Sequence, residues 1–149
     1  MNHQMKDFLQ HQTCGSISCV DDNGRPYSFN IFYAFNVYEG LLYFKSAENT
    51  RHAELMKSHP FVSGTILPDK MNHLHIRGVQ FEGIVLPMDH LLSKNAPANY
   101  YHKHPFASAM PGNIWTVKIN HIKFTDNSMG FGKNFSWVRE EEELAAFDC

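Results

Sequence analysis

The sequence predicts a mainly β domain with short helices, most simply a six-stranded antiparallel barrel. Six short runs carry the alternating or continuous apolar pattern of strands. Tight-turn sequences such as Asn23-Gly24 join some of these runs, and the segments between the others have the spacing of short helices. Closing such a sheet on itself removes its exposed edges, so a barrel is favoured over a sandwich.

Length and composition indicate one domain over residues 1–149. Hydrophobic residues make up 43% of the chain, and 13 Lys and Arg oppose 15 Asp and Glu, a net charge of −2. A chain of this size buries a core without crosslinks, and its balanced charge argues against a protein that mainly coats nucleic acid or an anionic membrane. The three cysteines cannot all pair, and no signal-peptide or membrane-spanning pattern is present, so reduced thiols and a cytoplasmic location are expected.

The first half of the chain predicts one helix followed by a three-stranded meander. Met5, Phe8 and Leu9 recur at helical spacing, after which the period changes to alternation. Turn sequences at Asn23-Gly24 and Glu39-Gly40 separate the strands. The expected segments are a helix over Met5 to Gln12 and strands over Cys14 to Val20, Tyr27 to Phe35 and Leu41 to Lys45.

The second half predicts three more strands with helices between them. Asn49 or Thr50 is suited to cap a helix that Pro60 ends. Glycines at 78 and 83 interrupt the fifth strand and mark a bulge or a close approach to the backbone. The expected segments are strands over Phe61 to Leu67, His73 to Leu86 and Ile114 to Phe124, a helix over Asp89 to His102 capped by Asp89, and an acidic helix over Glu140 to Phe147.

The segment from Lys45 to His52 is a candidate anion site. A strand ends there and a helix begins, and the free N–H groups at a helix start attract negative charge. Hydroxyls of Ser46 and Thr50 and the forked donors of Arg51 would complete a phosphate cradle. An ordinary helix cap with a solvated arginine explains the same residues.

Other motifs give weaker evidence for a functional site. His73-Leu74-His75 and His102-Lys103-His104 place two imidazoles on one side of a segment, but ten histidines make such pairs expected by chance, and no metal site is predicted. Gly130-Phe131-Gly132-Lys133 resembles the start of a phosphate loop without its full spacing. Cys14 and Cys19 are expected to be buried packing residues. No catalytic residue is assigned.

Aromatic residues are numerous enough to hold a planar ring. Most of them are expected to pack in the core, and stacking on a ligand would need at least one exposed ring. The candidates are Phe32, Tyr33, Trp115, Phe124, Phe131 and Trp137.

The order of these elements and the run Thr50-Arg51-His52 resemble the split-barrel flavin-binding proteins of the pyridoxamine 5′-phosphate oxidase superfamily. The resemblance spans nearly the whole chain. Within that group, four runs look specifically like the uncharacterised YhbP-type bacterial proteins: 50–53 (TRHA), 76–81 (IRGVQF), 122–127 (IKFTDN) and 130–133 (GFGK).

The resemblance implies a homodimer that binds FMN at the subunit interface. The family's hydroxyl-Arg-Lys phosphate stretch matches Thr50, Arg51 and His52, with histidine in place of the usual lysine. Residues facing the flavin ring match the region from Asn30 to Tyr33, a fifth-strand polar contact matches Gln80, and the partner's C-terminal segment matches Thr125 through Lys133. Together with the Lys45 segment, the candidate cofactor-binding residues are Lys45, Ser46, Thr50, Arg51, His52, Asn30, Phe32, Tyr33, Gln80 and Lys133.

The function that follows from the resemblance is that of a small FMN-dependent oxidoreductase acting on an unidentified organic substrate. Oxidation of vitamin B6 is not expected, because the additional substrate-phosphate arginines and the longer C-terminal region of those relatives are not found here. The alternative is a non-catalytic protein that stores or senses flavin, or another planar cofactor such as haem, in the same cleft. FMN would supply the redox chemistry and the protein would position it.

Overall fold

A computed structural model describes residues 1–128 and 133–140. The helices are α1 (His3–His11), α2 (Arg51–Ser58) and α3 (Ala96–Lys103), with two short 3₁₀ helices, η1 (Leu91–Ser93) and η2 (Pro105–Ala109). The strands are β1 (Cys14–Val20), β2 (Pro26–Asn36), β3 (Leu41–Ser46), β4 (Phe61–Ile66), β5 (Arg77–Val85), β6 (Asn113–Asp126) and β7 (Lys133–Val138).

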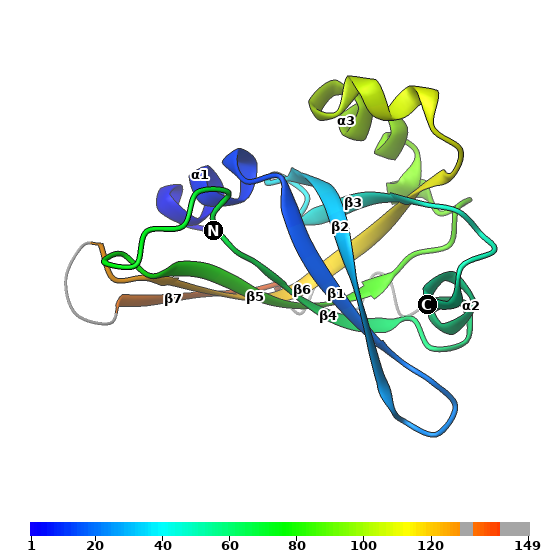
Figure 1. Ribbon diagram of the computed structural model, residues 1–149, viewed down its shortest axis with the longest axis horizontal. Helices are drawn as coiled ribbons and strands as arrows, with labels where there is room; N and C mark the ends of the chain where they lie inside the picture. Colours follow the sequence, from blue (N-terminus) through cyan, green and yellow to red (C-terminus); the bar gives the residue numbers. More distant parts are fainter. Residues whose placement is uncertain (129–132, 141–149) are drawn as a thin grey trace.

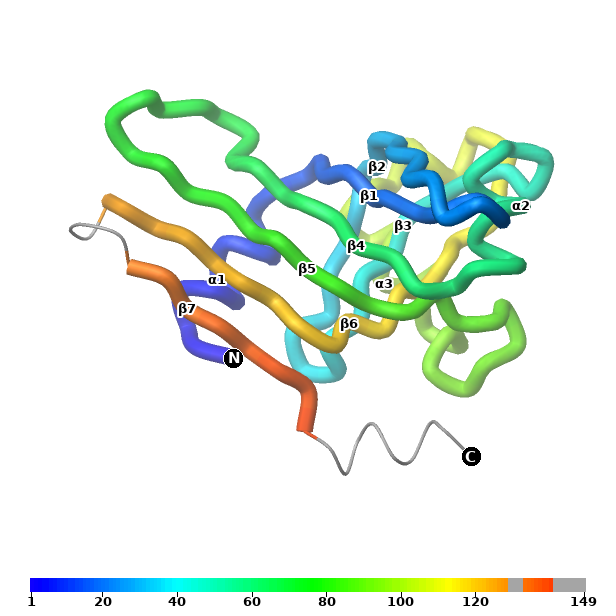
Figure 2. Tube along the Cα trace, turned by 90° about the horizontal axis from the view of Figure 1, so that it is seen from below, coloured from blue at the N-terminus to red at the C-terminus, as the bar shows by residue number. Residues whose placement is uncertain are grey.

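The strands form one antiparallel sheet in the order β3-β2-β1-β4-β5-β6-β7. An additional pairing of β3 with β6 closes the first six strands into a barrel, while β7 extends the sheet beyond it (Figures 1 and 2). β6 is the longest strand and can pair with three neighbours, β3, β5 and β7. The mainly β class and the six-stranded antiparallel barrel predicted from the sequence are therefore confirmed.

Helices cover the barrel at separate places. α1 and α2 lie toward opposite ends in Figure 1, and both contribute buried apolar residues to the main core. α1 supplies Met5, Phe8 and Leu9, and α2 supplies Ala53 and Met56. α3 covers a smaller second cluster against β2, β3 and β6. The helices at the seams therefore bury apolar surface that the sheet alone would leave exposed.

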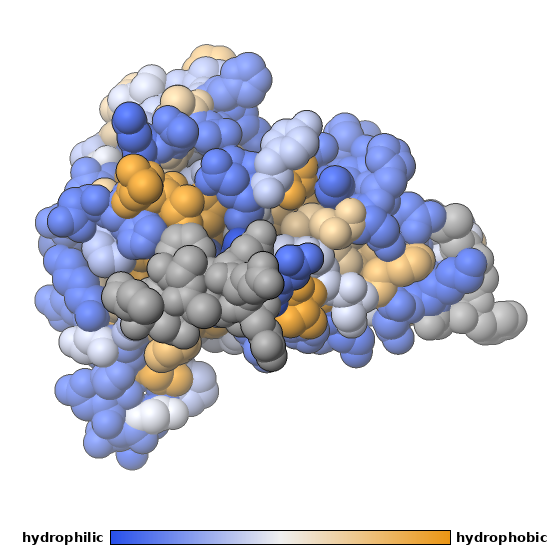
Figure 3. Space-filling model, turned by 180° about the vertical axis from the view of Figure 1, so that it is seen from behind, coloured by the Kyte–Doolittle hydropathy of each residue, from blue (hydrophilic) through white to orange (hydrophobic). Residues whose placement is uncertain are grey.

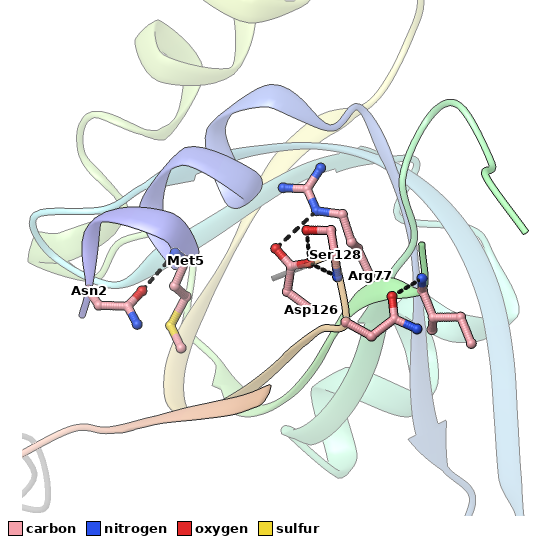
Figure 4. A network of polar contacts seen from close by, with 7 residues as sticks. Asn2, Met5, Arg77, Asp126 and Ser128 are labelled. Carbon is pink, nitrogen blue, oxygen red and sulfur yellow. Dashed lines mark hydrogen bonds and ion pairs between the residues drawn. The ribbon is translucent and has the colours of Figure 1, made fainter. Parts of the chain in front are cut away.

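A polar network joins the ends of β5 and β6 beside α1 (Figure 4). Arg77 Nε lies 3.4 Å from Asp126 Oδ2, and the backbone N–H and hydroxyl of Ser128 both donate to Asp126 Oδ1. Burial by itself would raise the pKa of Asp126, but the hydrogen bonds from Ser128 and the charge of Arg77 hold it below its usual value. Two of the runs that carry the resemblance noted in the sequence, 76–81 and 122–127, are neighbours in space.

Two predicted elements differ from the structure, and one strand was not predicted. Residues 73–75 form a turn and bend, so β5 begins at Arg77 and not at His73. The helix predicted over Asp89 to His102 is divided into η1 and α3, and the side chain of His90, not Asp89, caps η1. β7 was not predicted, because its residues become a strand through pairing with the far end of β6.

The predicted burial of Cys14 is also wrong. Cys14 is exposed, whereas Cys19 is buried as expected, and both are free thiols. Side chains alternate along a strand, so Cys19 shares the inner face of β1 with Ile17 while Cys14 lies on the outer face.

Some expectations concern parts of the chain outside the described residues. These are residues 130–132, including Phe131, and nearly all of the acidic segment predicted to be helical after Glu140. Across residues 1–128 and 133–140, no group of three or more His, Cys, Asp or Glu lies together as metal ligands would. No helix in that same part of the chain is long and apolar enough to cross a membrane.

Candidate functional site

The start of α2 gathers hydroxyl, imidazole and backbone N–H groups at one corner of the barrel. Thr50 is the N-cap, and its hydroxyl oxygen accepts a hydrogen bond from the N–H of Ala53 at 3.3 Å. Ser46 Oγ lies 3.5 Å from Thr50 Oγ1 and 2.6 Å from His52 Nε2. The N–H groups of Arg51 and His52 belong to the first turn and have no carbonyl partner within the helix. We call Ser46, Thr50, Arg51 and His52 the α2 corner.

Two aromatic residues of β2 support this corner. The rings of Phe29 and His52 stack with centroids 3.8 Å apart and an angle of 8° between their planes. The guanidinium of Arg51 lies 5.1 Å from the centre of the Tyr27 ring. Burial lowers the pKa of His52, so in the ligand-free protein the neutral imidazole is favoured. Sequence reasoning did not assign Tyr27 and Phe29 to the site, although both lie in the strand predicted over Tyr27 to Phe35.

The backbone before α2 is held in place by β6 and the turn that precedes it. The indole N–H of Trp115 donates to the carbonyl of Ser46 at 3.1 Å. Gly112 has a φ of +128°, and a Cβ there would lie 3.1 Å from the carbonyl carbon of Ser46. The close approach therefore favours glycine at this position. These contacts fix the direction of the loop that leads to the α2 corner.

Lys45 points away from the α2 corner. Its ammonium group donates to the hydroxyl of Tyr101 at 2.9 Å and to the carbonyls of Ala107 and Met110, each at 2.6 Å. Neighbouring residues of a strand face opposite sides, so Lys45 and Ser46 cannot serve the same face of β3. In this structure Lys45 fastens the segment after α3 to the barrel.

The candidate residues of β2 also divide between two faces. Asn30 and Phe32 lie on the outer face, and Phe32 is 62% exposed, which makes it an exposed ring able to stack on a ligand. Tyr33 is fully buried, and its hydroxyl donates to the carbonyl of Leu9 at 2.7 Å. Burial strongly raises the pKa of Tyr33. The Tyr33 side chain is therefore not accessible to a ligand.

Asn30 and Gln80 lie in one row across the outer face of the sheet. Strand register places Asn30 opposite Ser16, Ser16 opposite Thr65, and Thr65 opposite Gln80. Three strand spacings separate the two ends of this row, which is about 14 Å. Asn30, Ser16 and Thr65 also line a cavity of about 500 Å³.

Lys133 is exposed at the start of β7, opposite Asp126. It therefore lies toward the same end of the sheet as the beginning of β5, which carries Gln80. The structure thus brings Ser46, Thr50, Arg51 and His52 together at the α2 corner. Gln80 and Lys133 belong to a second region of the same chain.

The α2 corner has the chemistry of an anion site. It combines two hydroxyls, two backbone N–H groups, an imidazole and a guanidinium at the positive end of an eight-residue helix. The backbone N–H groups and the guanidinium can donate hydrogen bonds to a phosphate monoester. The Ser46 and Thr50 hydroxyls donate to the carbonyl of Ala47 here and would have to turn to reach the phosphate.

Comparisons with known proteins agree with this description. The family model described as pyridoxamine 5′-phosphate oxidase matches residues 1–125. UPF0306 protein YhbP of Salmonella schwarzengrund (strain CVM19633) is 34% identical over 128 residues, which are 86% of this chain and 87% of that protein.

Solved structures share the fold at low sequence identity. A pyridoxamine 5′-phosphate oxidase-related, FMN-binding protein of Nostoc punctiforme superposes with a TM-score of 0.67 at 11% identity, covering 94% of this chain and 91% of the other. A haem-binding protein of Mycobacterium smegmatis superposes with a TM-score of 0.70 at 16% identity, covering 91% of this chain and 55% of the other. The extent of the family match and the identity to YhbP show that the chain belongs to the pyridoxamine 5′-phosphate oxidase family.

Proposed function

We propose that this protein binds FMN and holds its phosphate at the α2 corner. The observation that carries the proposal is that the Ser46 hydroxyl lies within 3.5 Å of both the Thr50 hydroxyl and the His52 imidazole, at the start of a helix whose first N–H groups have no partner within the helix. An ordinary helix cap needs one side-chain acceptor, which Thr50 already supplies. The further donors in the first turn fit a bound anion.

The charges around the corner support the same assignment. Arg51 is exposed and lies on the Tyr27 ring, so its guanidinium can reach an incoming phosphate without leaving a buried partner. His52 is neutral when the site is empty because burial lowers its pKa, and a phosphate beside it would favour the charged form. The corner therefore gains positive charge on binding the ligand that it is proposed to hold.

We further propose that the working unit is a homodimer. Gln80 and Lys133 lie on β5 and β7, away from the α2 corner. Strand register places Ser46 opposite Asn113 and Gln80 opposite Lys123, ten residues apart on β6, which is roughly 30 Å along the strand. One ligand would not contact all of these residues within a single chain. A second subunit that presents its β5–β7 region to the first would complete the site.

FMN, when bound, supplies hydride or single-electron transfer. On this proposal the chain is a small flavin-dependent oxidoreductase for an organic substrate, and its own residues bind and orient the cofactor. The α2 corner holds the phosphate. The exposed ring of Phe32 lies on the opposite face of β2 from Phe29, which stacks on His52, so Phe32 is not assigned to a ligand at the same corner. No side chain is assigned as an acid or base.

The visible spectrum of freshly purified protein, together with the mass of any released ligand, tests cofactor identity. Flavin absorption bands and the mass of FMN are the expected results, and anaerobic reduction by a nicotinamide donor would then test for turnover. If the protein is isolated without a cofactor, saturable FMN binding in a titration is expected. A haem spectrum would support the alternative suggested by the Mycobacterium neighbour, and failure to bind FMN would contradict the proposal.

Sedimentation tests the homodimer. A species of twice the 17.2 kDa chain mass is expected at micromolar concentration. A monomer that binds FMN with full affinity would show that the site is complete within one chain.

A further inference from the structure

A second cavity, of about 650 Å³, lies between α2, the start of β4, the end of β5 and β6. Its volume is within the range of small-molecule sites. None of the candidate cofactor-binding residues lines it. Its described lining consists mainly of apolar side chains, among them Met56, Phe61, Ile84, Leu86, Met88 and Trp115.

Some of these apolar side chains are exposed to water. Phe61 is 70% exposed and Met88 is 42% exposed, whereas Trp115, deeper in the wall, is 4% exposed. Phe61 is paired with Ile84 across β4 and β5, so the two form one continuous apolar surface. Figure 3 shows an apolar patch, within a mostly polar surface, on the half of the molecule that carries α2 and α3. A ligand with a flat apolar body would remove this surface from water.

An irregularity of the sheet places a polar group in the same wall. The β5–β6 register passes from Glu82 opposite His121 to Gly83 opposite Ile119, so Asn120 is an extra residue at a bulge. A Cβ at Gly83 would lie 2.6 Å from the carbonyl oxygen of Lys118, so the bulge depends on glycine. The buried side-chain oxygen of Asn120 has no hydrogen-bond partner within the described parts of the chain. A buried acceptor of this kind favours a ligand or water that donates to it.

The charged residues of the lining favour an anion. Lys57 is exposed on α2, and Lys118 is 3% exposed in the wall formed by β6. Glu48 is the acidic residue of the described lining, and its carboxylate accepts a hydrogen bond from the side-chain amide of Asn113 at 3.0 Å. Lys118 has an interaction of its own, so Lys57 is the lysine of the described lining that an acidic ligand would meet, beside a carboxylate that is already hydrogen-bonded.

We propose that this cavity is a binding site for a planar aromatic acid. The aromatic body would lie against Phe61 and the neighbouring apolar residues, and the acidic group would lie near Lys57. A donor on the ligand, or a bridging water, would satisfy Asn120 if the bulge adjusts. The site does not depend on flavin, since it shares no residue with the α2 corner.

Calorimetric titration of the flavin-free protein with 2-naphthoate and with the neutral 2-naphthamide tests this proposal. Saturable binding with one site per chain is expected, with the acid at least fivefold tighter than the amide. Lys57→Glu should weaken naphthoate about tenfold and leave naphthamide nearly unchanged. Lys94→Glu is the matched control, because Lys94 is exposed and does not line the cavity.

A second pair of variants tests the apolar wall. Phe61→Ser should weaken both ligands severalfold, whereas Phe106→Ser, at a side chain that is 92% exposed and outside the cavity, should weaken neither. Both positions are exposed, so the variants are expected to fold, which circular dichroism checks. Equal affinity for acid and amide, equal effects of test and control variants, or absence of saturable naphthoate binding would overturn the proposal.

Titration in the presence of saturating FMN separates this site from the proposed cofactor site. An unchanged naphthoate affinity is expected. Competition by FMN would show that the cavity belongs to the flavin site and would overturn its assignment as a separate one. Failure of FMN to bind would contradict the proposed function and leave the naphthoate result valid.

Discussion

Replacing Arg51 by alanine tests whether the α2 corner holds a phosphate. The guanidinium is exposed and its visible contact is with the Tyr27 ring at 5.1 Å. A cation–π contact at an exposed position contributes about 0.5–1 kcal/mol, so Arg51→Ala should leave the fold intact. A charge-assisted hydrogen bond to phosphate contributes roughly 1.5–3 kcal/mol, which corresponds to a loss of FMN affinity of about ten- to a hundredfold.

Riboflavin provides the comparison, because it has the same ring system and no phosphate. Fluorescence titrations of wild type and Arg51→Ala with both ligands, at one salt concentration, should show a large loss for FMN and a small one for riboflavin. Arg25→Ala, at an exposed arginine in the β1–β2 turn, is the control for the loss of one positive charge and should change neither affinity by more than about twofold.

Two results would refute this reasoning. An equal loss for FMN and riboflavin would mean that Arg51 acts through the structure of the corner and not through the phosphate. Unchanged FMN affinity would mean that the phosphate binds elsewhere, and the assignment of the α2 corner would have to be withdrawn.

Three further predictions concern protonation and packing. Burial lowers the pKa of His52, and a bound phosphate would raise it, so FMN binding should take up protons and weaken as pH rises from 6 to 8.5. His52→Lys should flatten this dependence, and parallel titration curves for the two proteins would show that His52 does not touch the phosphate. Gly64→Ala would place a Cβ 2.2 Å from the ring of Phe81 and should destabilise the protein by about 1–3 kcal/mol in urea unfolding, whereas Gly78→Ala, whose nearest neighbour is 3.5 Å away, should unfold like wild type. Burial lowers the pKa of Lys103 from 10.5 to about 8, so between these values the unfolded state binds more protons and the free energy of unfolding should rise with pH. A pH series on Lys103→Met should lack this rise, and the same slope in both proteins would contradict the assignment.

Local sequence patterns were sufficient to predict the class of the fold and the start of α2. Alternation of side chains and the turn at Asn23-Gly24 predict the β1–β2 hairpin, which the structure confirms. The hydroxyl of Thr50, three residues before Ala53, predicts a helix cap, and the structure forms that hydrogen bond. These features depend on neighbours within a few residues, so the sequence contains the information directly.

Other elements depend on residues far apart in the chain. β7 exists as a strand because β6 extends to Asp126 and offers it a partner. Residues 73–76 have enough apolar side chains to be mistaken for a strand, but they lie in the connection between β4 and β5. Propensity cannot distinguish such cases, because pairing with a distant strand decides them.

By itself, the sequence determined the mainly β class of the fold and the resemblance to a flavin-binding family, and it led to the hypothesis of an anion site at Thr50 and Arg51. Tertiary structure decided which candidate residues can act together. Closure of the barrel through β3 and β6 directs Ser46 toward the α2 corner and Lys45 toward Tyr101 on the other side. It also buries Tyr33 and exposes the adjacent Phe32. The physical reason is that neighbouring residues of a strand face opposite sides, and the assignment of the two faces to core, ligand or solvent follows from the packing of the whole barrel.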